Sequence, residues 1–86
     1  GHTPGHQSVL VNLPKTGHML FTGDACYTED HWCDKCLPGL VASSSDAAES
    51  VSKLRKVAKE HEATVVWGHD PISWKIWKKA PMFYYD

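Results

Sequence analysis

The segment LFTGDACY, residues 20–27, joins an apolar run to a sharp turn that carries a carboxylate. The run HMLFTG at 18–23 is the second of two apolar stretches separated by PKTG, and the first is SVLVNL at 8–13. Apolar stretches bounded by Pro and Gly indicate strands, so we predict a hairpin. Asp24 then follows directly after a strand, at one edge of a sheet.

The rest of the chain supplies a helix, a third strand and a short final helix. One apolar stripe with spacings of three and four predicts an amphipathic helix from Asp46 onward, its members being Ala47, Val51, Leu54 and Ala58. Asp46, followed three residues later by Glu49, fits an N-cap pair. ATVVWG at 63–68 reads as a buried strand, and a short helix is expected after Pro71.

Between the second strand and the long helix lies a stretch without a sustained hydrophobic period. Residues 29–45 contain Pro38, Gly39 and three serines, and we predict a long loop there. No internal repeat and no linker divides the chain, so the sequence predicts one α/β unit.

Composition excludes several classes of partner. The chain has 86 residues and a formal net charge of −1, and no run of Lys and Arg is longer than a pair. A basic footprint for nucleic acid or for an anionic membrane surface is therefore absent, and the apolar runs are too short to span a bilayer. The three cysteines are odd in number and clustered, which favours a reducing cytoplasm over a secreted disulfide framework.

Three polar side chains stand at the ends of predicted strands. His2 comes just before the first strand, Asp24 just after the second, and His69 just after the third, in WGHD. Side chains at the same end of neighbouring strands can converge, and a His/Asp/His set suits zinc or a similar divalent ion. Taken singly, a strand-end histidine is typical of a surface position and Asp24 of a turn. Spacing alone leaves both interpretations open.

Three motifs, GHTPGHQSVLV, LFTGDACY and VVWGHDPISW, together resemble the C-terminal half of the metallo-β-lactamase superfamily, most closely its N-acyl homoserine lactonase branch. The resemblance covers nearly the entire chain, and three ordered motifs at compatible separations are far more specific than any one. It implies that residues 1–86 are a partial domain, the C-terminal half of an αββα sandwich. This half would contribute one mixed or antiparallel sheet with helices on its outer face.

The resemblance also implies a role for each matching residue. His2 and His69 correspond to metal ligands, and Asp24 to the carboxylate that bridges two zinc ions. His6 corresponds to a supporting residue. Tyr27 corresponds to the tyrosine whose hydroxyl reaches the substrate carbonyl, so Asp24 and Tyr27 are the catalytic candidates. The implied activity is zinc-dependent opening of the ring of N-acyl homoserine lactones, which are small-molecule substrates.

One part of the family pattern is absent from this sequence. The His-x-His-x-Asp-His motif, which supplies four ligands from the first half of the fold, does not occur in it. Each metal would then keep two protein ligands where a zinc site has three or four. We therefore expect a fragment of a longer enzyme, inactive by itself and prone to self-association through an uncovered apolar sheet face.

Three alternatives remain at this point, one of which is that the chain is a nonfunctional truncation product or gene fragment. Another hydrolase of the same fold, acting on a thioester or a β-lactam, would share His2, Asp24 and His69. A non-catalytic zinc-binding module would instead use the set Cys26, His31, Cys33 and Cys36, because CDKC at 33–36 has zinc-knuckle spacing. A lone CxxC within a predicted loop is a weak signal for either zinc or redox chemistry.

Overall fold

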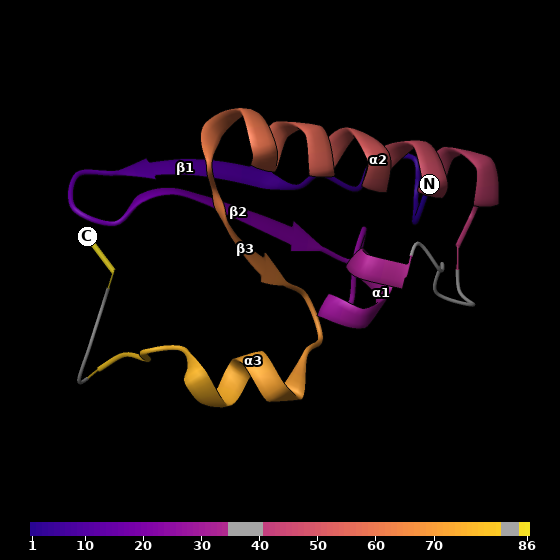
Figure 1. Cartoon of the computed structure of the whole chain (residues 1–86). Helices are drawn as coiled ribbons and strands as arrows, with labels where there is room; N and C mark the ends of the chain where they lie inside the picture. The colour runs from indigo at the N-terminus through magenta and orange to yellow at the C-terminus, as the bar shows by residue number, and fades with distance from the viewer. Residues whose placement is uncertain (35–40, 82–84) are drawn as a thin grey trace.

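The computed structural model describes residues 1–34, 41–81 and 85–86. A three-stranded sheet is flanked by helices (Figure 1). The elements in chain order are β1 (Val9–Leu13), β2 (Gly17–Gly23), α1 (Glu29–Asp34), α2 (Ser44–His61), β3 (Thr64–Trp67) and α3 (Pro71–Ile76). None of the helices in these ranges has the length and apolar character needed to cross a bilayer.

The sheet is mixed, which the sequence left open between mixed and antiparallel. Its order is β1-β2-β3, with β1 antiparallel to β2 and β2 parallel to β3. The hairpin between β1 and β2 is confirmed, and Gly17 occupies a positive φ of 86° where the tight turn returns into β2. Because β3 runs parallel to β2, both strands end at the same edge of the sheet.

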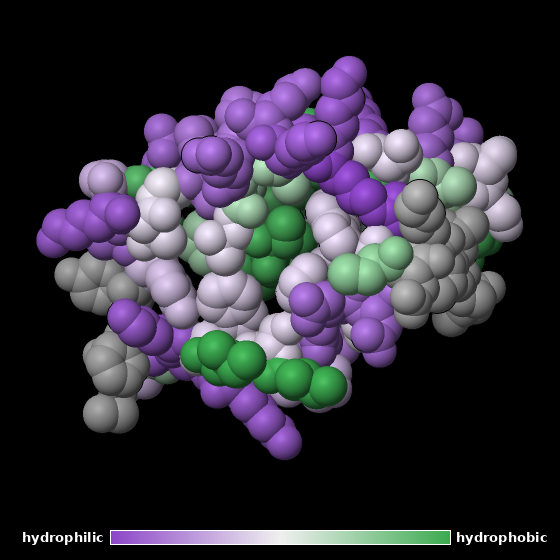
Figure 2. Space-filling model, in the orientation of Figure 1, coloured by the Kyte–Doolittle hydropathy of each residue, from purple (hydrophilic) through white to green (hydrophobic). Residues whose placement is uncertain are grey.

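Helix α2 connects β2 to β3 and covers one face of the sheet (Figure 1). The core forms beneath it, where Leu20 of β2 and Val51 of α2 are each 2% exposed. Ala47 and Ala58 of the predicted stripe are also buried, which confirms the orientation of the helix. Its outer face is hydrophilic, and Figure 2 shows this surface as a nearly continuous polar band.

The start of α2 differs from the prediction. Ser43, not Asp46, is the N-cap: its backbone is extended, and its side-chain oxygen accepts a hydrogen bond from the Asp46 N–H. Asp46 lies in the first helical turn, where its charge favours the positive end of the helix dipole. The Asp46/Glu49 spacing was compatible with a cap, but Ser43 precedes it and supplies the better local geometry.

The prediction of an uninterrupted loop over 29–45 was wrong at its start, where α1 forms. Thr28 caps this helix by accepting a hydrogen bond from the His31 N–H at 3.1 Å, and Glu29 and Asp30 place acidic groups in its first turn. Thr-Glu-Asp is therefore a helix start signal that the lack of hydrophobic period concealed. Of the remaining predicted loop positions, 35–40 lie outside the described residues, 41–43 are irregular as predicted, and 44–45 already belong to α2.

The second face of the sheet has a thinner cover. Helix α3 lies on this side (Figure 1), and a cavity of about 350 Å³ is lined there by Phe21, Trp74, Trp77 and Tyr85, among others. On α3 itself, Ile72 is 75% exposed and Ile76 is 78% exposed. Figure 2 shows hydrophobic surface over the position of α3. The molecule therefore presents apolar surface on the side away from α2.

Candidate metal centre

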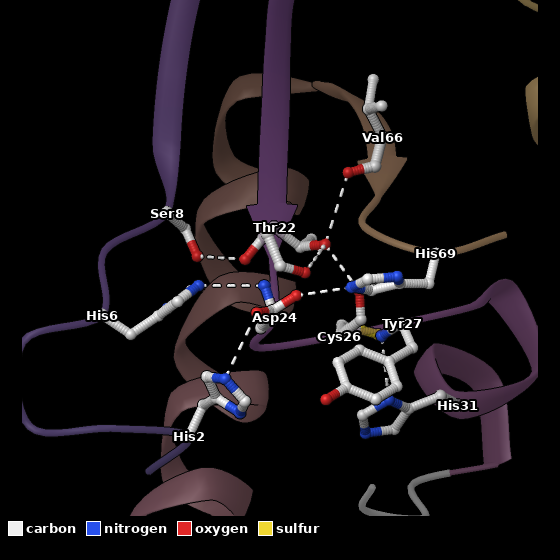
Figure 3. Close-up of polar contacts among 11 residues, drawn as sticks. His2, His6, Ser8, Thr22, Asp24, Cys26, Tyr27, His31, Val66 and His69 are labelled. Atoms are coloured by element: carbon white, nitrogen blue, oxygen red, sulfur yellow. Dashed lines mark hydrogen bonds and ion pairs between the residues drawn. The ribbon is translucent and has the colours of Figure 1, made fainter.

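Asp24 is placed by a sharp turn at the end of β2. Gly23 takes a positive φ of 57°, which glycine adopts without strain, and the chain turns there into the loop 24–27. The Asp24 N–H donates to His6 Nε2 at 2.9 Å (Figure 3). A Cβ at Gly23 would approach the same nitrogen to 2.8 Å, so the close contact depends on glycine. His6 thus supports Asp24 from the neighbouring segment.

His2 and His69 reach Asp24 from opposite sides. His2 Nε2 lies 3.2 Å from Asp24 Oδ2, and His69 Nε2 lies 2.7 Å from Asp24 Oδ1 (Figure 3). The three residues come from separate parts of the chain, and the common edge of the parallel pair β2 and β3 brings Asp24 and His69 together. His2 and His69 thus each approach Asp24, as predicted, but at separate oxygens of its carboxylate.

The histidines also set the ionisation of Asp24. The hydrogen bond to His69 is the largest influence and holds the pKa of the Asp24 carboxyl below its ordinary value, with His2 and His6 adding in the same direction against a desolvation effect. The carboxylate is thus ionised over the neutral range. Each of its oxygens faces one imidazole nitrogen, an arrangement suited to a carboxylate shared between two cations.

Tyr27 stands beside the same cluster. Its ring contacts the His69 ring edge to face at a centroid separation of 4.7 Å and the His2 ring at 6.4 Å. Figure 3 shows its hydroxyl directed toward the side where His2 and Asp24 lie. The tyrosine singled out in the sequence is therefore within the cluster, and its phenolic O–H is a hydrogen-bond donor there.

Backbone hydrogen bonds tie the end of β3 to the loop 24–27. The Gly68 N–H donates to the Cys26 carbonyl at 3.1 Å, and the His69 N–H donates to the Tyr27 carbonyl at 2.9 Å. The fully buried Thr22 hydroxyl adds a bond of 2.8 Å to the Cys26 carbonyl. These bonds fix the separation between Asp24, Tyr27 and His69, although the side chains themselves remain partly exposed.

The cluster borders an open cleft. A cavity of about 410 Å³ lies between the N-terminal segment and α2, and His2, His6 and Asp24 line it together with residues of the helix such as Lys53. The side chain of Asp24 is 40% exposed and that of His69 is 61% exposed. A small molecule can therefore reach the carboxylate and the imidazoles from solvent.

The donor chemistry fits a divalent metal, while the number of donors is small. Imidazole nitrogen and carboxylate oxygen are zinc ligands, and the nitrogens that now face the carboxylate are the atoms that would bind the ions. Over the described ranges, no three His, Cys, Asp or Glu side chains converge on a single point as a closed metal cage would require. His2 and His69 instead face different oxygens of Asp24.

The cysteine set proposed as an alternative zinc site is not assembled in the described residues. Cys26 is fully buried, and its thiol donates to the Thr28 carbonyl at 3.4 Å, whereas Cys33 is exposed. His31 uses Nδ1 to accept the Tyr27 N–H at 3.2 Å. Cys36 lies outside the described residues.

His31 is the residue near the cluster whose local role sequence reasoning missed. It is 7% exposed, and burial, followed by the positive charge of Arg55, lowers the pKa of its imidazole. The signal that could have revealed it is the spacing: His31 follows Tyr27 by four residues and the helix cap Thr28 by three. From the sequence, His31 is assigned only to the alternative zinc site with the three cysteines.

Comparison with known proteins identifies the family of this chain. The model of the metallo-beta-lactamase superfamily matches residues 1–69, a span that includes His2, Asp24, Tyr27 and His69. The chain belongs to the metallo-beta-lactamase superfamily. The resemblance inferred from the three motifs is thereby confirmed.

Relatives of known activity within the superfamily are similar over most of the chain. The chain is 58% identical over 84 residues to the N-acyl homoserine lactonase AttM of Rhizobium radiobacter, covering 98% of this chain and 32% of that protein. It is 39% identical over 70 residues to an N-acyl homoserine lactonase of Bacillus cereus, covering 81% of this chain and 28% of that protein. The chain therefore spans about a third of the length of these superfamily members.

Solved structures of the superfamily agree with the fold. An N-acyl homoserine lactone hydrolase with the product N-hexanoyl-L-homoserine bound at its catalytic metal centre matches with a TM-score of 0.87 and 32% identity. The match covers 94% of this chain and 32% of that chain. A quorum-quenching N-acyl homoserine lactone lactonase matches with the same TM-score and identity. The mixed sheet and its helices are thus a part of the metallo-beta-lactamase fold, as expected.

Proposed function

We propose that these residues form the C-terminal part of a zinc-dependent hydrolase that opens the lactone ring of N-acyl homoserine lactones. The observation that carries the proposal is the arrangement around Asp24, where His2 and His69 face separate carboxylate oxygens and Tyr27 stands beside them. The high identity to the lactonase AttM across nearly all of this chain supports the choice of substrate class.

In this proposal the chain contributes the shared part of a two-zinc centre. His2 and His69 would each hold one ion, and Asp24 would bind both through its two oxygens. Bound zinc supplies an acidified water as nucleophile and polarises the carbonyl of the substrate. Three protein donors are too few for two zinc ions, so further ligands would come from outside these 86 residues.

Tyr27 would act on the carbonyl oxygen of the lactone. Hydrolysis adds water across the ring ester bond: the carbonyl carbon gains an oxygen, the ring C–O bond breaks, and an N-acyl homoserine results. Negative charge develops on the carbonyl oxygen during the attack, and a phenolic O–H aimed at that atom stabilises it. The backbone hydrogen bond from the His69 N–H to the Tyr27 carbonyl holds the phenol close to His69, the proposed metal ligand.

The test uses the full-length protein that carries these residues and a panel of substrates. Ring opening of several N-acyl homoserine lactones would be followed by acid release and compared with hydrolysis of a thioester and a β-lactam. We expect the lactones to be the preferred class. Preference for the thioester or the β-lactam would instead identify another hydrolase of the same fold.

Two substitutions separate the proposed roles. Asp24→Asn should remove bound zinc together with activity, because a neutral amide cannot replace a charged bridge between two cations. Tyr27→Phe should keep the zinc content and lower kcat by about 10²-fold, a loss typical of one oxyanion donor. Tyr85→Phe is the matched control, since the Tyr85 hydroxyl accepts the Lys78 N–H at the far end of the molecule. Full activity in Tyr27→Phe would contradict the role of the phenol.

A further inference from the structure

Tyr27 is surrounded by imidazole rings, and the proposed reaction assigns no role to one of them. The phenol ring lies edge to face with His69, His2 and His31, at centroid separations of 4.7, 6.4 and 6.4 Å. His2 and His69 contact Asp24. His31 instead lies on α1 and bonds to the backbone of the tyrosine, because the Tyr27 N–H donates to His31 Nδ1 at 3.2 Å (Figure 3).

His31 is mounted on a well-anchored element. Its own N–H donates to the Thr28 hydroxyl, which fixes it in the first turn of α1. The next residue, Trp32, ties α1 to α2, since its carbonyl accepts hydrogen bonds from Nε and Nη2 of Arg55 at 2.9 and 2.6 Å. The guanidinium also lies 5.7 Å from the Trp32 ring centroid. Packing and hydrogen bonds thus lock the position of the imidazole.

The hydrogen bonds of His31 also define its tautomer. Because Nδ1 accepts a hydrogen bond, the proton of the neutral ring is on Nε2. Nε2 is buried and has no partner among the described residues. An apolar side chain of similar size would avoid the cost of burying an unpaired N–H. The hydrogen bond to Tyr27 is therefore the contact that accounts for an imidazole at this position.

We propose that His31 is a positioning residue for Tyr27 in the hydrolase proposed above, on which this inference rests. Its Nδ1 anchors the Tyr27 N–H, restrains the backbone at that residue, and so keeps the phenol ring against His69 with its hydroxyl on the side of His2. The same device holds Asp24, whose N–H donates to His6 Nε2. In this proposal His31 acts through Tyr27 and not directly on the metal or the substrate.

Three substitutions in the full-length protein test which atom of His31 matters. In His31→Asn the side-chain oxygen can occupy the place of Nδ1, in His31→Gln it falls nearer the place of Nε2, and in His31→Leu no acceptor remains. We expect the Gln and Leu variants to lose about 10- to 100-fold in kcat for lactone opening with little change in KM, as for loss of an outer-shell partner. The Asn variant should keep most of the activity.

A double-mutant cycle separates positioning from a general effect on folding. In the Tyr27→Phe background, the Asn, Gln and Leu variants at position 31 should have equal kcat values, because the hydroxyl that His31 positions is gone. His61→Leu, the same chemical change at the exposed end of α2, is the control and should leave kcat unchanged. Equal losses from His31→Leu in both backgrounds, or equal kcat for His31→Asn and His31→Leu, would overturn the proposal and leave His31 a merely structural residue.

A measurement on the unmodified protein does not depend on any variant folding. Nitrogen NMR of the His31 ring should report a proton on Nε2 and a bare Nδ1, and the Tyr27 amide should be protected from hydrogen exchange. A proton on Nδ1 would overturn the inference even in an active enzyme. Absence of lactone opening by the wild type would instead refute the proposed function, whereas wild-type turnover with unaffected variants would refute this inference alone.

Discussion

Residue by residue, the cluster is assembled from imidazoles used in two different ways. His2 and His69 face the oxygens of Asp24 with Nε2, whereas His6 and His31 accept backbone N–H groups from the loop 24–27. The first pair contacts the Asp24 carboxylate, and the second pair supports the loop. A neutral imidazole has one acceptor nitrogen, so a supporting histidine must remain unprotonated to keep its bond.

The buried imidazole of His31 predicts a pH dependence of stability. Burial and Arg55 lower its pKa in the folded protein, while in the unfolded chain the pKa lies near 6.5. Below that pH the unfolded state binds the proton more readily, so stability should fall as pH drops from about 6.5 toward the lowered folded value. Urea unfolding of the full-length protein at a series of pH values measures this slope.

His31→Asn provides the comparison for that slope, because the amide does not titrate. The difference in unfolding free energy between wild type and variant should change across this pH window and be constant above it. A difference that stays the same from pH 7 to pH 5 would show that His31 titrates alike in both states.

For individual residues, the sequence indicated the members of the cluster but not the hydrogen bonds that His6 and His31 accept from the backbone. His2, Asp24, Tyr27 and His69 could be named because they lie in sequence motifs that resemble those of a known family. The bond between His31 and Tyr27 could not, since it depends on α1 forming. That helix lacks an apolar period and is specified by Thr28 and two acidic residues.

Among the elements, β2 and β3 approach each other closely at their C-terminal ends, where Gly23 faces Gly68. A Cβ at Gly68 would lie 2.3 Å from the Gly23 carbonyl oxygen, so Gly68→Ala forces the two backbones apart. We expect a loss of roughly 1–3 kcal/mol in unfolding free energy, as for other overpacking substitutions, together with weaker zinc binding as His69 moves from Asp24. Chemical denaturation and metal titration of the full-length protein measure the two effects.

Gly5→Ala is the matched control, because no atom lies within 4 Å of a Cβ built there. Its unfolding free energy and zinc affinity should stay close to those of the wild type. If Gly68→Ala behaves like Gly5→Ala, the close approach of β2 and β3 is not what positions His69.

The start of α2 gives a second prediction about an element. Ser43→Ala removes the side chain that accepts the Asp46 N–H and should lower the unfolding free energy by about 1 kcal/mol. Asp46→Ala removes only a favourable charge in the first turn and should cost less, about 0.3–1 kcal/mol. Thermal and urea unfolding of both variants in the same protein decide the point, and a larger loss for Asp46→Ala would favour the cap expected from sequence.

The hydrophobic periodicity of helices and strands predicted most of the elements. The errors, at α1 and at the N-cap of α2, occurred where polar side chains determine the structure. The stripe of α2 and the apolar runs of the sheet are long enough to read directly. The exact cap of α2 and the existence of α1 depend on which of several serine, threonine and aspartate side chains bonds to the backbone. Ser43 and Asp46 are both suitable N-cap residues, and sequence alone does not tell which one caps the helix until the direction of the preceding chain is known.

In the molecule as a whole, the sheet face away from α2 is only thinly covered by α3. Val9 is 54% exposed and Phe21 40% exposed on the side away from α2, and Ile72 and Ile76 project from α3. We expect the isolated 86-residue chain to self-associate, which sedimentation over a range of concentrations would detect. Ile72→Lys with Ile76→Lys should shift it toward monomer, and a concentration-independent monomer in the unsubstituted chain would contradict this expectation.

The isolated chain should also be a poor catalyst. With His2, Asp24 and His69 as its donors, zinc binding should be weaker than in the full-length protein, and lactone opening should be undetectable. Metal content per chain and turnover with added zinc, measured for both proteins side by side, test this. Clear turnover by the 86 residues would show that the donors present here suffice.

The overall topology followed from the sequence only in part. The order of strands and helices was readable, but the parallel pairing of β2 with β3 is a contact between segments far apart in the chain. That pairing, with α2 as the connection, is what brings Asp24 and His69 within hydrogen-bond distance. Local pattern holds no information about such a long-range contact, whereas the family resemblance does.

The two backbone hydrogen bonds between the end of β3 and the loop 24–27 constrain the length of that loop. Cys26 and Tyr27 accept bonds from two consecutive amides, Gly68 and His69, and Asp24 lies on the same short loop. One added or deleted residue in that loop would shift the phenol or the carboxylate by a full backbone step, about 3.8 Å, relative to His69. Insertions and deletions are therefore excluded from these four positions by geometry, whatever residue types occupy them.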